Sequence, residues 1–242
     1  MNQFNDLSIF DNIKEYCEAY RIPLEHFMDI LEDQKVLPMI RGKANEYIAK
    51  IVLERNLSRS WRVQKLNLNA QPGRVDEDIA ITHARTGRRL KVEAKSAVRG
   101  SFRLGTPRTK INAPHFKVKC HRSRSNIKKS KTTNDRYLVN DFDLIICNVS
   151  NALFAGKTIG DNLELINNED AIKHLKLFYN TQIDGDLIDA TYRDWLCCFP
   201  RTIAETDGSL PRTPPVKLTN DENWFRISHL EKYLNIEIQK RT

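Results

Sequence analysis

Two short apolar runs separated by a turn-like stretch form the clearest pattern in the chain. The runs occupy residues 79–81 and 90–92, and residues 84–87 between them read Ala-Arg-Thr-Gly. This arrangement is typical of a β-hairpin with a four-residue loop. If His83 pairs with Arg88, side-chain alternation puts the isoleucines of the first run and the leucine and valine of the second on one face of the hairpin.

Apolar residues recur at helical or strand spacing over much of the remaining chain. The predicted helices cover residues 7–20, 23–34, about 41–55, 168–179 and 224–234. The predicted strands cover residues 115–120, 144–149 and 195–199. The second of these strands is an unbroken apolar run, which indicates burial on both faces. Helices, a hairpin and a buried strand in this order predict an α/β fold with a mixed central β-sheet flanked by helices.

Acidic side chains stand where the open face of the hairpin is expected. In the predicted register Asp78 faces Glu93, and Asp76 faces Lys95. Two carboxylates directly opposite each other repel, and a sheet gains no stability from such a pair. A divalent cation between them would resolve the conflict, and a neighbouring lysine can orient or activate a water molecule. The pattern therefore predicts a metal-dependent hydrolase site, and the competing interpretation is a solvated hairpin face.

Positive charge is concentrated directly after this hairpin. The chain carries 39 Lys and Arg against 31 Asp and Glu, a net charge of +8. Residues 99–131 hold 11 basic side chains and no acidic one, so this segment alone exceeds the net charge of the whole chain. A concentrated cationic segment is typical of a protein that binds a polyanion. The alternative is a disordered basic loop.

Alternation within residues 115–120 favours a folded strand over that loop. The strand is expected to bury Phe116, Val118 and Cys120 and to expose His115, Lys117 and Lys119. A folded cationic strand beside a metal site is suited to holding a phosphodiester.

An acidic residue followed on the next strand by Glu93-Ala94-Lys95 resembles the motif of the PD-(D/E)XK nucleases, the superfamily of most restriction endonucleases. The resemblance covers about residues 41–149. Residues 75–78 read Val-Asp-Glu-Asp and lack the proline of the family name, which leaves Asp76 and Asp78 competing for the role of the first acid. Asp78 is preferred because it lies opposite Glu93 and leads directly into the buried run.

The resemblance implies Mg²⁺-dependent cleavage of double-stranded DNA at a specific sequence, leaving 5′-phosphate ends. The expected metal ligands are Asp78, Glu93 and the backbone carbonyl of Ala94, and Lys95 is expected to position the attacking water. Many of these nucleases carry a glutamate on the helix before the hairpin, where this chain has Glu46. Glu46 is therefore a fourth expected catalytic residue, and the alternative is a solvent-facing helical glutamate.

Seven basic residues of the cationic segment are expected to bind DNA. Lys and Arg contact phosphates without regard to sequence, whereas the arginine fork also fits O6 and N7 of guanine in the major groove. The candidates for base or groove contacts are Arg103, Arg108 and Lys110, and those for phosphate contacts are Lys117, Lys119, Arg122 and Arg124.

A chain of 242 residues fits a single nuclease domain. Residues 41–149 are the expected catalytic core, residues 1–40 a helical N-terminal part, and residues 150–242 a part for specificity or dimer contacts. A two-fold homodimer is expected, because one such site cuts one strand and a palindromic target has two-fold symmetry. A cognate DNA methyltransferase is expected in the same host, without being a physical partner.

Cysteine usage excludes several other classes of protein. The five cysteines are odd in number and lack Cys-x-x-Cys spacing, so neither a disulfide framework nor a zinc site is indicated, and none of the six histidines forms a pattern with a cysteine. With no signal peptide and no apolar stretch of membrane-spanning length, the cytoplasm is the expected location.

Two alternatives to a restriction enzyme stay open. The first is another nuclease on the same core (a junction resolvase, a repair nickase or a modification-dependent enzyme), and the second is a non-catalytic nucleic-acid-binding module.

Overall fold

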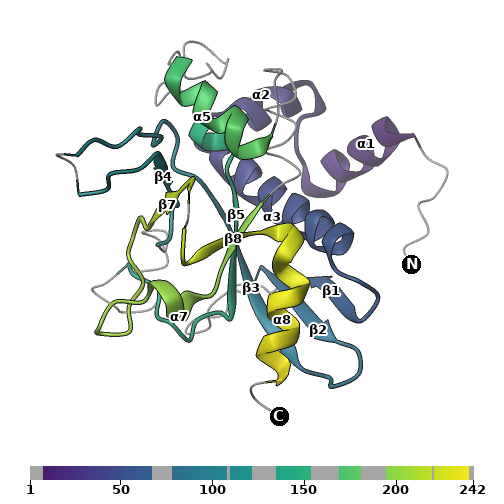
Figure 1. Cartoon of the computed structure of the whole chain (residues 1–242). Helices are drawn as coiled ribbons and strands as arrows, with labels where there is room; N and C mark the ends of the chain where they lie inside the picture. Colours follow the sequence, from purple (N-terminus) through teal and green to yellow (C-terminus); the bar gives the residue numbers. More distant parts are fainter. Residues whose placement is uncertain are drawn as a thin grey trace. The chain divides into compact units, whose positions relative to one another are not determined.

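The computed structural model of the chain describes seven stretches. These are residues 8–66, 78–107, 110–121, 135–153, 169–180, 195–219 and 221–239. The chain divides into two compact units, Met1–Ala44 and Asn45–Thr242 (Figure 1). Within the described stretches no helix is long and apolar enough to cross a membrane.

Helices make up the described part of the first unit, as predicted. They are α1 (Ile9–Tyr20), a 3-10 turn (Leu24–His26), α2 (Phe27–Glu32) and the start of α3 (Leu37–Asn56). A capping box between Ser8 and Asp11 fixes the beginning of α1 by satisfying backbone N–H groups that the first turn leaves open. α3 begins earlier than predicted, because Pro38 lies in its first turn, where a missing N–H is tolerated.

A six-stranded mixed β-sheet forms the centre of the second unit. Its strands are β1 (Trp61–Lys65), β2 (Ile79–His83), β3 (Arg89–Ser96), β5 (Leu144–Asn148), β6 (Leu196–Cys198) and β8 (Trp224–Arg226), in that spatial order. β3 and β5 run parallel, and the other neighbouring pairs run antiparallel. The predicted α/β class with a mixed central sheet is confirmed.

The hairpin has the predicted register. Ile79 pairs with Val92 across β2 and β3, and the N–H of His83 donates to the carbonyl of Arg88 at 2.8 Å. The loop closes through Gly87, which has a φ of +67° and donates its N–H to the carbonyl of His83. A glycine suits this position because a side chain disfavours positive φ. The register places the residue before β2, Asp78, opposite Glu93.

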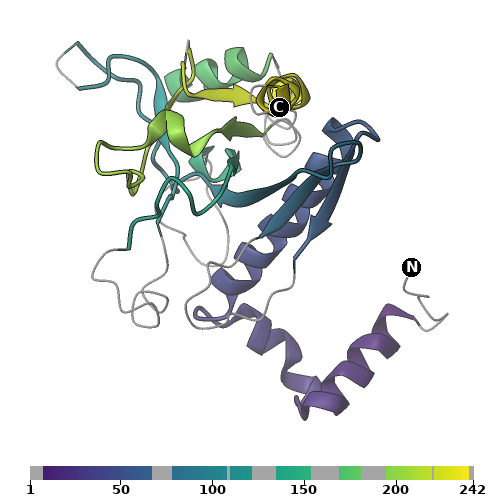
Figure 2. The ribbon, with the colours of Figure 1, turned by 90° about the horizontal axis from the view of Figure 1, so that it is seen from below.

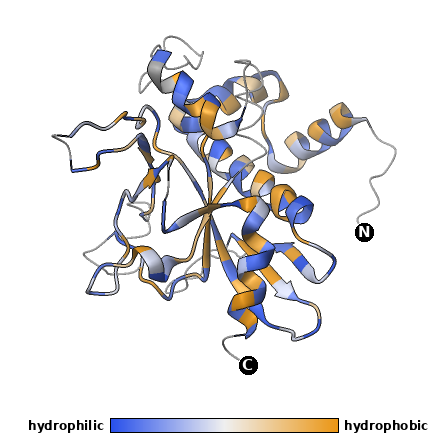
Figure 3. Ribbon diagram, in the orientation of Figure 1, coloured by the Kyte–Doolittle hydropathy of each residue, from blue (hydrophilic) through white to orange (hydrophobic). Residues whose placement is uncertain are grey.

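Both faces of the sheet are buried, which explains the unbroken apolar run of β5. Ile145 and Cys147 belong to one core, and Leu144 and Ile146 belong to the other. The first core is completed by α5 (Glu169–Tyr179), whose Leu175 is fully buried. The second is completed by α8 (Leu230–Gln239) and by the part of α3 that follows Ala44, which runs along β1 and β2 (Figure 2). The central strands are correspondingly hydrophobic (Figure 3).

A separate two-stranded sheet carries the cationic strand. Here β4 (His115–Lys117) pairs antiparallel with β7 (Pro215–Lys217). The predicted alternation is confirmed for Phe116, Val118 and Cys120, which are fully buried, and for Lys117 and Lys119, which are exposed. The prediction is wrong for His115, which is buried because its Nδ1 lies 2.8 Å from the carbonyl oxygen of Ala113 and its backbone pairs with Arg103 and Lys217.

Several elements differ from the predicted pattern. β1 was not predicted, although Trp61 and Val63 alternate with polar residues. Trp224–Arg226 forms a strand rather than the start of a helix, because the Asp221 side chain accepts the N–H of Trp224 and turns the backbone into an extended path beside β6. The short α7 (Pro200–Ile203) follows β6 directly. All five cysteines are free and buried, including the adjacent pair Cys197 and Cys198 in β6.

Candidate active site

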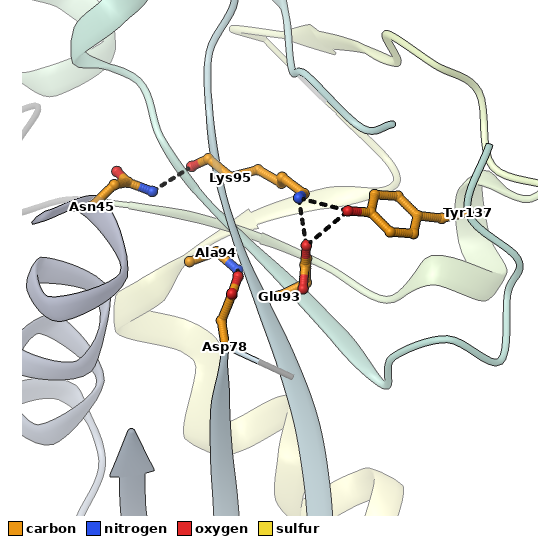
Figure 4. Close-up of polar contacts among 6 residues, drawn as sticks. All are labelled: Asn45, Asp78, Glu93, Ala94, Lys95 and Tyr137. Carbon is orange, nitrogen blue, oxygen red and sulfur yellow. Dashed lines mark hydrogen bonds and ion pairs between the residues drawn. The ribbon is translucent and has the colours of Figure 1, made fainter. Parts of the chain in front are cut away.

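The candidate site forms where β2 begins beside β3. Asp78 precedes β2, and its Oδ2 accepts the backbone N–H of Ala94 at 3.0 Å (Figure 4). The Asp78 carboxylate thus accepts a hydrogen bond from β3 that a backbone carbonyl of the neighbouring strand would otherwise accept. Because the N–H and C=O of one strand residue point to the same side, the Ala94 carbonyl also faces the side on which Asp78 lies.

Glu93 and Lys95 form a buried group with Tyr137, which was not among the predicted site residues. The Lys95 Nζ contacts Oε1 of Glu93 and donates to the Tyr137 hydroxyl at 3.1 Å. The Tyr137 hydroxyl donates to the same Glu93 oxygen at 3.2 Å. Figure 4 shows Glu93 and Lys95 pointing together toward the Tyr137 ring. The Tyr137 ring packs edge-on against the ring of Phe142, with 4.8 Å between the ring centroids.

Burial and neighbouring carboxylates disfavour an ionised Asp78. Burial, the largest effect, and then the carboxylates of Glu93 and Glu46 raise the pKa of Asp78 to about 8, against the smaller opposing effects of Lys95 and the Ala94 N–H. Burial, the largest single effect, lowers the pKa of Lys95, but the combined effects of Glu93, Tyr137 and Asp78 outweigh it and leave that pKa well above its ordinary value. An ionised Asp78 would therefore add more negative charge than the described neighbours neutralise.

Glu46 reaches the site from α3 and is bound there by a second lysine. Lys65, the last residue of β1, lies 2.7 Å from Oε2 of Glu46, and both side chains are largely buried. The Lys65 Nζ also donates to the carbonyls of Leu66 and Asp78, each at 3.1 Å. A neighbouring α3 residue, Asn45, donates its side-chain N–H to the carbonyl of Lys95 at 3.4 Å. The Glu46 side chain is therefore largely buried rather than solvent-facing, and it shares Lys65 with the Asp78 carbonyl.

The cationic strand runs directly past the end of β3. The N–H of Lys119 donates to the carbonyl of Ser96 at 3.2 Å, and the N–H of Val98 donates to the carbonyl of Lys117 at 2.7 Å. Ser96 follows Lys95 in the chain, so two exposed lysines are attached to the strand that carries the candidate catalytic lysine.

The remaining predicted DNA contacts are placed only in part. Arg103 is exposed, and its guanidinium folds back to donate to the carbonyls of Gly100 and Phe102. Lys110 is exposed. Three predicted contacts and the competing first acid lie outside the described residues. These are Arg108, Arg122, Arg124 and Asp76.

The donor set suits a hard cation that keeps most of its own water. No group of three or more His, Cys, Asp or Glu side chains able to hold a metal occurs in the described stretches. Mg²⁺ needs no such group, because it is usually bound through one or two carboxylates, with water and phosphate at its other positions. Asp78, Glu93 and the Ala94 carbonyl fit that requirement.

Comparisons with known proteins leave the identity of the chain open. No protein-family model, no curated protein and no solved structure matches it.

Proposed function

We propose that the chain is a Mg²⁺-dependent, sequence-specific endonuclease of double-stranded DNA, of the type II restriction class and with a PD-(D/E)XK core. It would hydrolyse phosphodiester bonds and leave 5′-phosphate ends. The observation that carries the proposal is the meeting of Asp78, Glu93 and Lys95 at the mixed sheet, beside a folded cationic strand.

The repulsion at Asp78 supports a catalytic rather than a structural role. A carboxyl whose pKa is raised to about 8 by burial and by neighbouring carboxylates weakens the fold at neutral pH, and it lies in contact with the motif residue Ala94. Strongly perturbed groups of this kind cluster at functional sites. A bound cation would turn the same repulsion into attraction.

The roles follow from the contacts. Asp78, Glu93 and the Ala94 carbonyl would hold Mg²⁺, which supplies charge for the developing phosphorane and lowers the pKa of a water molecule. Lys95, as an ammonium group, orients the attacking water and donates to a phosphate oxygen. Tyr137 keeps the Lys95 side chain at the site through its hydroxyl.

Lys117 and Lys119 are proposed to hold the phosphates of the DNA backbone near the scissile bond, because they are exposed and attached to the end of β3. Arg103 and Lys110 remain candidates for groove contacts. A homodimer would place two such sites on the two strands of a palindromic target.

Digestion of a plasmid of known sequence, with and without Mg²⁺, tests the proposal. Discrete Mg²⁺-dependent fragments with mapped 5′-phosphate ends are expected from the wild-type chain, and none from Glu93→Ala or Lys95→Ala. Both variants should still retard DNA in a gel. Nicked circles alone would favour a repair nickase, and binding without cleavage would favour a non-catalytic module. If Asp78→Ala stayed active while Asp76→Ala did not, the first acid would be Asp76.

A further inference from the structure

The Lys65 side chain is largely buried and held by three contacts, unlike the side chain of a surface lysine. Its side chain is 8% exposed and that of its partner Glu46 is 13% exposed. An ammonium group has three donors, and Lys65 uses them on Glu46 and on the carbonyls of Leu66 and Asp78. The Asp78 carbonyl also accepts the backbone N–H of Leu66 at 3.2 Å.

The two lysines of the site differ in how they are held. Lys95 binds one carboxylate and one hydroxyl, both on side chains. Lys65 binds two backbone carbonyls, one at the end of β1 and one at the start of β2, in addition to its carboxylate. A group that displaced Lys65 from Glu46 would leave a buried ammonium short of one partner, which is strongly unfavourable. Lys65 is therefore held by three contacts, two of them to backbone carbonyls, and Lys95 by two contacts to side chains.

We propose that Lys65 is a positioning residue that holds Glu46 beside Asp78 and takes the place of a second divalent cation, so that the site binds a single metal ion through Asp78 and Glu93. The inference rests on the proposed function, because it concerns how the same site is completed. In this arrangement Glu46 forms an ion pair with Lys65 and does not bind a metal ion. It also gives β1, the strand at the edge of the sheet, a direct part in the site.

Charge supports this assignment over a purely structural ion pair. The negative charge of Glu46 acts on the Asp78 carboxyl, so Glu46 belongs to the electrostatic surroundings of the proposed metal. A second divalent cation bound by Glu46 would share the Glu46 carboxylate with the Lys65 ammonium group. Two positive charges bound to one carboxylate repel strongly in a buried site.

Equilibrium dialysis of the full chain against Mn²⁺ tests the inference, with free Mn²⁺ measured by electron paramagnetic resonance. One Mn²⁺ per wild-type chain is expected, and none at this site for Asp78→Asn. Two per wild-type chain would overturn the role of Lys65 and leave the proposed function standing. No Mn²⁺ bound to the wild type, or unchanged binding by Asp78→Asn, would overturn the metal site itself.

Two variants at the ion pair make the test specific. Lys65→Met should bind two Mn²⁺, because Glu46 then loses its fixed cation, and a folded Lys65→Met chain that binds one refutes the inference. Should that variant fail to fold, the double variant Lys65→Met/Glu46→Gln decides, since it removes both buried charges together. It should bind one Mn²⁺ with an affinity within about threefold of the wild type. A loss of about tenfold or more would make Glu46 a metal ligand and overturn the proposal.

Discussion

Replacing Asp78 by Asn should stabilise the metal-free chain, by an amount that grows with pH. The pKa of Asp78 is raised from an ordinary value of 3.8 to about 8, first by burial and then by Glu93 and Glu46. The folded chain therefore keeps this carboxyl protonated at pH values where the unfolded chain has released the proton. Stability from this group is fully present below about pH 4 and is lost as the pH rises to about 8. An Asn side chain keeps the shape and cannot ionise.

The size of the effect follows from the difference between the two pKa values. Each tenfold change in proton affinity corresponds to about 1.4 kcal/mol. Ionisation of Asp78 thus destabilises the wild-type fold by on the order of 5 kcal/mol above pH 8, if the neighbouring side chains stay in place. Local rearrangement will reduce this value, and a gain of at least about 2 kcal/mol for Asp78→Asn is expected at pH 8. The gain should nearly vanish toward pH 4.

Urea unfolding of both proteins in EDTA, at intervals between about pH 5 and pH 9, measures this difference. Asp207→Asn is the matched control, because hydrogen bonds from Ser209 lower the pKa of this exposed Asp207 carboxyl. Because the pKa of Asp207 lies at or below 3.8 in both the folded and the unfolded chain, its stability difference should stay constant between pH 5 and pH 9. A difference between Asp78→Asn and wild type that stays constant from pH 5 to pH 8 would refute the reasoning. Adding Mg²⁺ at pH 8 should stabilise the wild type and not the variant.

Three further outcomes are expected. Tyr137→Phe should slow single-turnover cleavage by about tenfold and lower the free energy of unfolding by only about 1 kcal/mol. The reason is that one hydroxyl is lost while the Glu93–Lys95 pair remains. An unchanged cleavage rate would mean that Tyr137 contributes to packing alone. Lys117→Gln and Lys119→Gln should each reduce the salt dependence of DNA binding by about one phosphate contact, equally for all sequences, and an unchanged slope would make the strand a solvated face. Light scattering of the DNA complex should give two chains per duplex, and one chain per duplex that yields only nicks would favour a nickase.

The local part of the site could be predicted from the sequence because it depends on short-range rules. The loop over residues 84–87 fixes the hairpin register, and the period of two along a strand then places Asp78 opposite Glu93. The same rule located the exposed lysines Lys117 and Lys119. It failed at His115, where a contact two residues back, to Ala113, satisfies the imidazole and allows it to be buried.

The long-range part could not be predicted because nothing near it in the sequence indicates a partner. Tyr137 lies 42 residues after Lys95, and an isolated tyrosine in a polar stretch has no periodic signal. Lys65 could have been noticed, since Trp61 and Val63 alternate with polar residues and predict a strand that ends in a lysine. Its pairing with Glu46, however, depends on how α3 lies against the sheet.

The balance of charge at the site indicates what binding must change. Two of its three carboxylates, Glu93 and Glu46, are each paired with a lysine, while the third, Asp78, is held by one backbone N–H and has its pKa raised to about 8. A cation held by Asp78 and Glu93 would relieve the repulsion at Asp78 and would compete with Lys95 for Glu93. The ammonium group of Lys95 would then be available to a phosphate oxygen or to the attacking water of the proposed reaction. Metal binding and the release of Lys95 from Glu93 are therefore expected to be coupled through the Glu93 carboxylate. The Lys65–Glu46 pair is expected to stay in place.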